Sequence, residues 1–77
     1  MPLYVAEVDT TADQNIDAAL AAIATAAEGA GGEFIESQIT ADNNRIFAVI
    51  ESEAVPALAA GLNAAGLKVD ELAAVRL

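Results

Sequence analysis

The chain has 77 residues, which suits one small domain spanning residues 1–77. Hydrophobic residues make up 56% of it, but many are alanines that bury little area each, so we expect a thin core. Cysteine and histidine are absent, which excludes disulfides, thiolate or imidazole metal sites and histidine-based catalysis. We therefore predict no cofactor and no metal site. Any metal that did bind would need oxygen ligands.

Acidic residues outnumber basic ones by twelve to three, and the net charge is -9. A surface this acidic repels the phosphates of nucleic acids and of anionic lipids. No apolar run approaches the ~20 residues that span a bilayer, and residues 1–10 lack a basic stretch followed by an apolar one. We therefore expect a cytoplasmic protein that binds neither nucleic acid nor membrane.

The first part of the chain predicts a strand followed by a helix. Residues 3–9 alternate between apolar and polar and contain good strand formers. Thr11, with Gln14 three residues later, matches a capping box, so we expect the helix to begin there. Residues 29–32 are rich in glycine and should end it. The helix carries one apolar stripe, formed by Ile16, Leu20, Ile23 and Ala27.

The middle of the chain predicts a β-hairpin. Residues 34–40 and 45–51 both alternate. Between them, residues 41–44 are rich in side chains that tolerate a positive φ.

A second helix and a last strand complete the expected elements. Ser52 is placed to cap the helix, Pro56 falls near its first turn, and Gly66 is a plausible stop. Residues 72–77 supply the last strand, although their alanines are poor strand formers. The order β-α-β-β-α-β predicts an α+β, ferredoxin-like fold, in which a four-stranded sheet carries two helices on one face.

Alternation divides the strand residues between two faces. One set is apolar apart from a serine and is expected to lie under the helices: Tyr4, Ala6, Val8, Ile35, Ser37, Ile39, Ile46, Ala48, Ile50, Ala73, Val75 and Leu77. The other set mixes large apolar groups with charges and is expected on the open face: Leu3, Val5, Glu7, Phe34, Glu36, Gln38, Arg45, Phe47, Val49, Glu51, Leu72, Ala74 and Arg76.

Three segments carry a resemblance to known proteins: the opening MPLYVAE, the strand RIFAVIES and the ending NAAGLKVDELAAVRL. In these segments the chain resembles a family of short bacterial ferredoxin-like proteins, mostly of unknown function, that has a nickel-binding member. It is also similar to GYD-type proteins of the dimeric α/β-barrel superfamily. The resemblance implies the fold and a dimer. Nickel binding in such proteins relies on histidine, so the family name does not imply a nickel site here.

The open face holds the candidate site. We expect the first and third strands to run parallel and adjacent, so that Glu7 and Glu51 approach one another and Glu36 lies one strand further out. Such carboxylates could hold a hard cation or supply a general base. We favour a simpler interpretation, in which they form ion pairs with Arg45 and Arg76 of the same chain or of a partner.

Two functional hypotheses follow. The first is a small acidic, non-enzymatic domain that acts through homodimerisation or small-ligand binding at the open face, where Phe34 and Phe47 would take part. The alternative is a cofactor-free isomerase or oxygenase of the dimeric α/β-barrel type that uses a carboxylate base. A pocket beside Glu7 and Glu51 would favour the enzyme.

Overall fold

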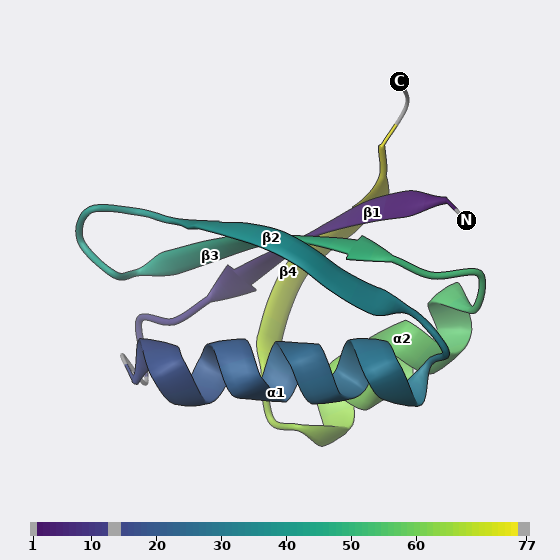
Figure 1. Cartoon of the computed structure of the whole chain (residues 1–77). Coiled ribbons are helices and arrows are strands. Elements are labelled where there is room, and N and C mark those ends of the chain that lie inside the picture. Colours follow the sequence, from purple (N-terminus) through teal and green to yellow (C-terminus); the bar gives the residue numbers. More distant parts are fainter. Residues whose placement is uncertain (1, 13–14, 76–77) are drawn as a thin grey trace.

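The chain forms a four-stranded sheet with two helices packed on one face (Figure 1). The computed structural model describes residues 2–12 and 15–75. Neighbouring strands are antiparallel, in the order β2-β3-β1-β4, which confirms the ferredoxin-like α+β fold. The elements are β1 (Leu3–Asp9), α1 (Ile16–Gly29), β2 (Glu33–Ile39), β3 (Arg45–Glu51), α2 (Val55–Ala64) and β4 (Lys68–Ala74).

The core lies between the two central strands and the helices. Ala6 of β1 pairs with Ala48 of β3 at its centre, and both are fully buried. Their larger neighbours on the same face fill the space under the helices, as alternation predicted. The largest fully buried apolar side chains are Val8, Ile23, Ile46, Ile50, Leu58 and Leu62.

The helix ends differ from the predicted ones. In α1 the cap is Asn15, whose Oδ1 accepts a hydrogen bond from the Ala18 amide at 3.1 Å. The expected start at Thr11 was wrong, because Thr11 donates to Asp9 instead, and Gln14 lies outside the described residues. The helix ends at Gly29, as predicted.

Ser52 does not cap α2 directly. Its Oγ accepts from the Ala54 amide at 3.1 Å, and Ala54 itself is the residue before the helix. Pro56 lies in the first turn and Gly66 follows the helix with a φ of 80°, as the sequence indicated. Neither helix, within the described part of the chain, is long and apolar enough to cross a bilayer.

Two β-bulges change which side chains face the helices. In β2 the pairing with β3 shifts between Phe34 and Glu36, which leaves Ile35 as an extra residue, 48% exposed. Phe34 therefore pairs with Ile50 and packs against the core. The prediction that Phe34 lies on the open face was wrong. A bulge interrupts the strict alternation on which the prediction relied.

The second bulge lies in β4, which begins at Lys68 rather than at residue 72. Asp70 is its extra residue, since Val69 pairs with Val8 and Glu71 with Glu7. Leu72 consequently lies opposite Ala6 and packs against the core, while Ala73 lies opposite Val5 on the open face. The predicted faces of β4 were therefore inverted.

Gly32 leads into β2 at a point where backbone approaches backbone. A Cβ at this position would lie 2.0 Å from the Glu51 carbonyl oxygen, whereas one at Gly29 would meet nothing within 4 Å among the described residues. We expect Gly32→Ala to lower the free energy of unfolding by about 2 kcal/mol or more, because rigid backbone must move.

The matched control is Gly29→Ala at the end of α1. It should be neutral or raise stability by about 0.5–1 kcal/mol, because alanine restricts the unfolded chain and favours helix. Urea unfolding of both variants checks this. Equal stabilities would contradict the close approach at Gly32.

Candidate functional site

The face of the sheet opposite the helices carries an uncovered apolar strip. Its members come from β1, β3 and β4 and are all partly exposed: Leu3, Val5, Phe47, Val49 and Ala73. Both helices lie on the other face (Figure 1), so no described element covers this strip. We call these five residues the apolar strip, and the face that carries them the open face.

Strand register explains how the strip is assembled. Val5 lies between Val49 of β3 and Ala73 of β4, so three neighbouring strands meet at its centre. Phe47 lies opposite Glu7, and Leu3 lies opposite Glu51. The strip is therefore continuous across the sheet, with a carboxylate toward each end.

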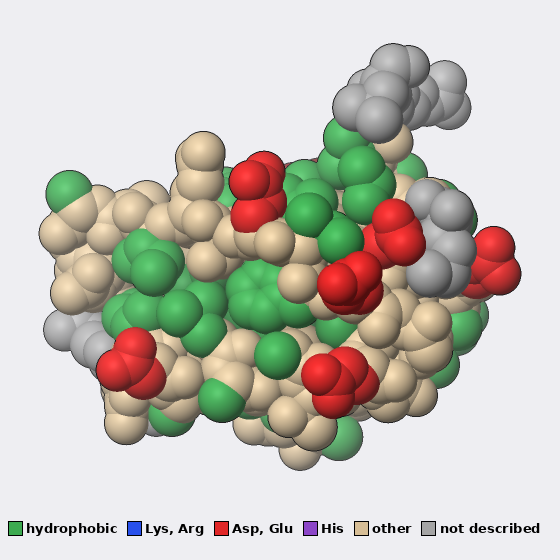
Figure 2. All heavy atoms as spheres, viewed as in Figure 1, with side chains coloured by type: hydrophobic (Ala, Val, Ile, Leu, Met, Phe, Trp, Pro, Cys, Tyr) green, Lys and Arg blue, Asp and Glu red, His purple; other side chains and the backbone are tan. Residues whose placement is uncertain are grey.

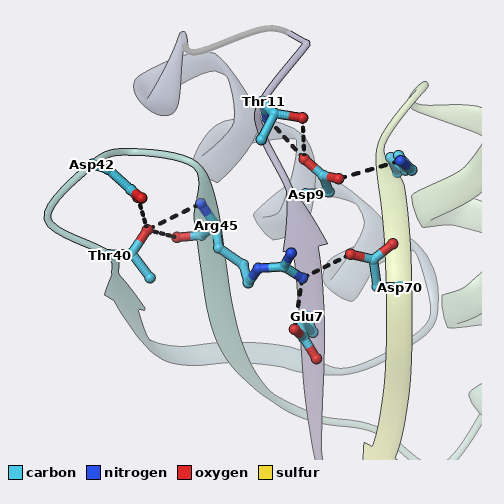
Figure 3. Close-up of polar contacts among 8 residues, drawn as sticks. Glu7, Asp9, Thr11, Thr40, Asp42, Arg45 and Asp70 are labelled. Atoms are coloured by element: carbon cyan, nitrogen blue, oxygen red, sulfur yellow. Dashed lines mark hydrogen bonds and ion pairs between the residues drawn. The ribbon is translucent and has the colours of Figure 1, made fainter.

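Arg45 connects three strands at one end of the strip (Figure 3). Its side chain extends from β3 across β1 toward β4, and Nη1 donates to Glu7 Oε1 at 2.7 Å and to Asp70 Oδ2 at 2.8 Å. The hydrogen bond to Asp70 has the largest effect on the pKa of Arg45 and raises it, and the hydrogen bond to Glu7 raises it further. These side chains are about one-third exposed or less, at 35%, 26% and 34%, which shields the contacts partly from water.

The ion pair between Glu7 and Arg45 confirms one of the expected partnerships. It does not neutralise the region, because Glu71 lies directly opposite Glu7 on β4. One guanidinium thus pairs with two carboxylates, those of Glu7 and Asp70, beside a third acidic residue, Glu71. Asp70 was missed from the sequence because it reaches this cluster through a bulge.

Glu7 and Glu51 do not approach one another. β1 and β3 are antiparallel, not parallel as predicted, so Glu51 pairs with Leu3 rather than near Glu7. Four residues of extended strand separate the two positions by roughly 13 Å. Glu51 instead lies opposite Glu33 of β2, and Glu36 lies opposite Val49.

The remaining predicted site residues do not lie together on one face of the described sheet. Phe47 lies on the open face, whereas Phe34 belongs to the opposite face. Arg76 lies outside the described residues. Among residues 2–12 and 15–75, no three acidic side chains are grouped closely enough to hold a metal ion.

A second polar cluster, absent from the predictions, lies where β1 ends. Asp9 Oδ1 accepts from the Thr11 amide at 2.8 Å and from its hydroxyl at 2.6 Å, and Lys68 Nζ lies 3.2 Å from Asp9 Oδ2 (Figure 3). The hydroxyl bond, then the amide bond and then Lys68 lower the pKa of Asp9 to about 2. The signal in the sequence was an aspartate two residues before a threonine, the pattern of an Asx-turn.

Three hollows of the described surface lie away from Glu7 and Glu51. One of about 200 Å³ lies beside Asp9, Asn15 and Lys68, and one of about 290 Å³ lies between α2 and β4. The third, of about 460 Å³, lies at the surface along the contact between α1 and α2 and is lined by alanine, glycine and threonine. Neither Glu7 nor Glu51 lines any of them, so they do not form the predicted pocket beside these two glutamates. Asp70 and Glu71 line the hollow between α2 and β4.

Comparison with known proteins finds no matching family model, no matching curated protein and no matching solved structure. The resemblance to short bacterial ferredoxin-like proteins therefore stays a prediction.

The Asp9 cluster predicts a defined acid titration. An aspartate whose pKa falls from its ordinary value of 3.8 to about 2 on folding stabilises the fold above pH 3.8. That stabilisation is lost as the pH falls toward 2, because protonation removes the charge that Thr11 and Lys68 favour. We expect Thr11→Ala to raise the pKa of Asp9 toward 3.8, as followed by NMR titration of its carboxyl carbon.

Thr25→Ala is the control for this titration. Thr25 is an exposed threonine whose hydroxyl donates to the Ala21 carbonyl oxygen within α1. This variant should leave the Asp9 titration unchanged. An Asp9 midpoint near 3.8 in the unaltered protein would contradict the assignment.

Proposed function

We propose that this protein acts by association rather than by catalysis, with its open face binding the open face of a second copy. The apolar strip carries the proposal, because a sheet face with one aromatic and three large aliphatic side chains left partly exposed is typical of an interface. A strip that crosses β3, β1 and β4 also suits a two-fold contact, in which each copy presents the same surface.

The composition of the core supports the same proposal. Among the described residues, half of the twelve that form the buried core are alanines: Ala6, Ala19, Ala26, Ala27, Ala30 and Ala48. Because alanine removes little apolar area from water, a domain of this size gains from burying further surface against a partner. The open face offers that surface without any change in the fold.

Substitution of the strip's centre tests the interface. Val5→Thr with Val49→Thr keeps the shape and strand preference of both side chains but introduces hydroxyls. In a two-fold dimer each substitution occurs twice, and each buried hydroxyl without a partner costs about 1 kcal/mol or more. Four such hydroxyls cost about 4 kcal/mol or more, so we expect the dimer Kd to rise at least about 500-fold, as measured by sedimentation equilibrium.

The control adds hydroxyls elsewhere. Ala57→Ser with Ala60→Ser changes exposed positions of α2, on the other side of the sheet, and should leave the Kd unchanged. A monomer mass for the unaltered protein over the whole concentration range would refute the proposal. A small ligand on the same face is the other outcome, recognised by a monomer whose Val5 and Val49 resonances shift on ligand addition.

Salt dependence distinguishes a second copy from a basic partner. The open face carries Glu7, Glu51, Asp70 and Glu71 against Arg45, so two such faces repel one another at long range. Screening weakens that repulsion, since the Debye length falls from about 10 Å at 0.1 M salt to about 3 Å at 1 M. We therefore expect the dimer Kd to fall several-fold over this range. A Kd that rises with salt would indicate an oppositely charged occupant instead.

A further inference from the structure

Each edge strand of the sheet is protected in its first half. β4 carries Lys68, Asp70 and Glu71 and a bulge at Asp70 in its first four residues, devices that discourage pairing with another strand, whereas Leu72-Ala73-Ala74 has none of them. β2 has its bulge at Ile35 and its charges at Glu33 and Glu36, all in its first half. The second half, Ser37-Gln38-Ile39, has no charge, proline or bulge, and we call it the plain edge.

The plain edge presents free backbone groups. The Thr40 amide donates to the Arg45 carbonyl oxygen at 3.1 Å, so Thr40 belongs to a hydrogen-bonded pair with β3. Hydrogen-bonded pairs alternate along an antiparallel ladder, so Gln38 also points its backbone groups toward β3. The amides and carbonyls of Ser37 and Ile39 therefore point outward, and no strand lies beyond β2 in the described sheet.

Apolar side chains gather beside the same edge. Figure 2 shows hydrophobic side chains collected between β2 and α1. Ile16 and Leu20 of α1 are only partly buried against the core, and Ile39 is 40% exposed. Exposed isoleucines on an edge strand favour pairing with a further strand, because pairing removes them from water.

We propose that the plain edge pairs antiparallel with the plain edge of a second copy, with Gln38 of each chain on the two-fold axis. In this register Ser37 of one copy exchanges backbone hydrogen bonds with Ile39 of the other. Ile39 then lies opposite Ser37, and the α1 helices of both copies lie on the same face of a continuous sheet. The bulge at Ile35 falls outside the paired segment and is not disturbed.

In this register charge does not oppose a second copy as the occupant. The register places Glu36 opposite Thr40 of the other chain, so no two carboxylates face each other directly. The two Glu36 positions lie four residues apart along the strands, or roughly 13 Å. This exceeds the Debye length of about 8 Å at physiological ionic strength, so their repulsion is largely screened.

Amide exchange tests the pairing directly. In a free monomer, and in a dimer joined only through the open face, the Ser37 and Ile39 amides contact water and exchange quickly. In the edge-paired form both amides donate to the other chain, and we expect their exchange in the unaltered protein to slow at least about tenfold as concentration rises. The Gln38 amide, bonded within the sheet, should change less and serves as the internal reference.

Substitution at Ser37 gives the second test. Ser37→Pro removes an outward-pointing amide that the chain's own sheet does not use. An edge strand tolerates proline at such a position. It should abolish the concentration-dependent protection of Ile39. Ser37→Thr keeps the donor and should retain that protection.

The outcomes separate this contact from the open-face dimer. Val5→Thr with Val49→Thr should remove the open-face contact while leaving Ile39 protection concentration-dependent. In the Ser37→Pro variant, the Kd of the open-face dimer should still rise when the two valines are substituted. If the Ser37 and Ile39 amides of the unaltered protein exchange at unprotected rates at every concentration, the edge pairing is wrong, whatever the open face does.

Discussion

The close approach of two alanine-rich helices to one face of the sheet is the constraint on which the rest of the structure depends. Ala6 and Ala48 pair at the centre of that face, and Gly61 of α2 lies so near Ala26 that an added Cβ would be 3.4 Å from the Ala26 side chain. Small residues allow this proximity, but they remove little apolar surface from water. Larger side chains therefore remain uncovered on the opposite face, which makes that face the candidate site.

The sequence was sufficient for the elements of the fold but not for every side-chain direction. Alternation in residues 45–51 placed Ile46, Ala48 and Ile50 correctly in the core, because β3 itself contains no extra residue. It failed for Phe34 and Leu72, because each lies in a strand with a bulge. A bulge inserts one residue without leaving a distinct signature in the sequence.

The candidate site was predicted in part for similar reasons. With only three basic residues in the chain, an arginine partner for Glu7 could be expected, and Arg45 fills that role. The predicted meeting of Glu7 and Glu51 depended on strand direction, which was misassigned. Thr11 belongs to two local patterns that compete for its hydroxyl, and the turn with Asp9 forms in place of the helix cap.

The shared guanidinium of Arg45 has a consequence for how this sequence can change over time. Glu7 and Asp70 both depend on one nitrogen of Arg45, and Lys68, another of the three basic residues, is already paired with Asp9. Loss of Arg45 would leave the carboxylates of two strands without local compensation, whereas neutral replacements at Glu7 and Asp70 would relieve the need for it. Among related sequences these positions should therefore covary, with loss of the arginine tolerated where at least one of the acids has already been replaced.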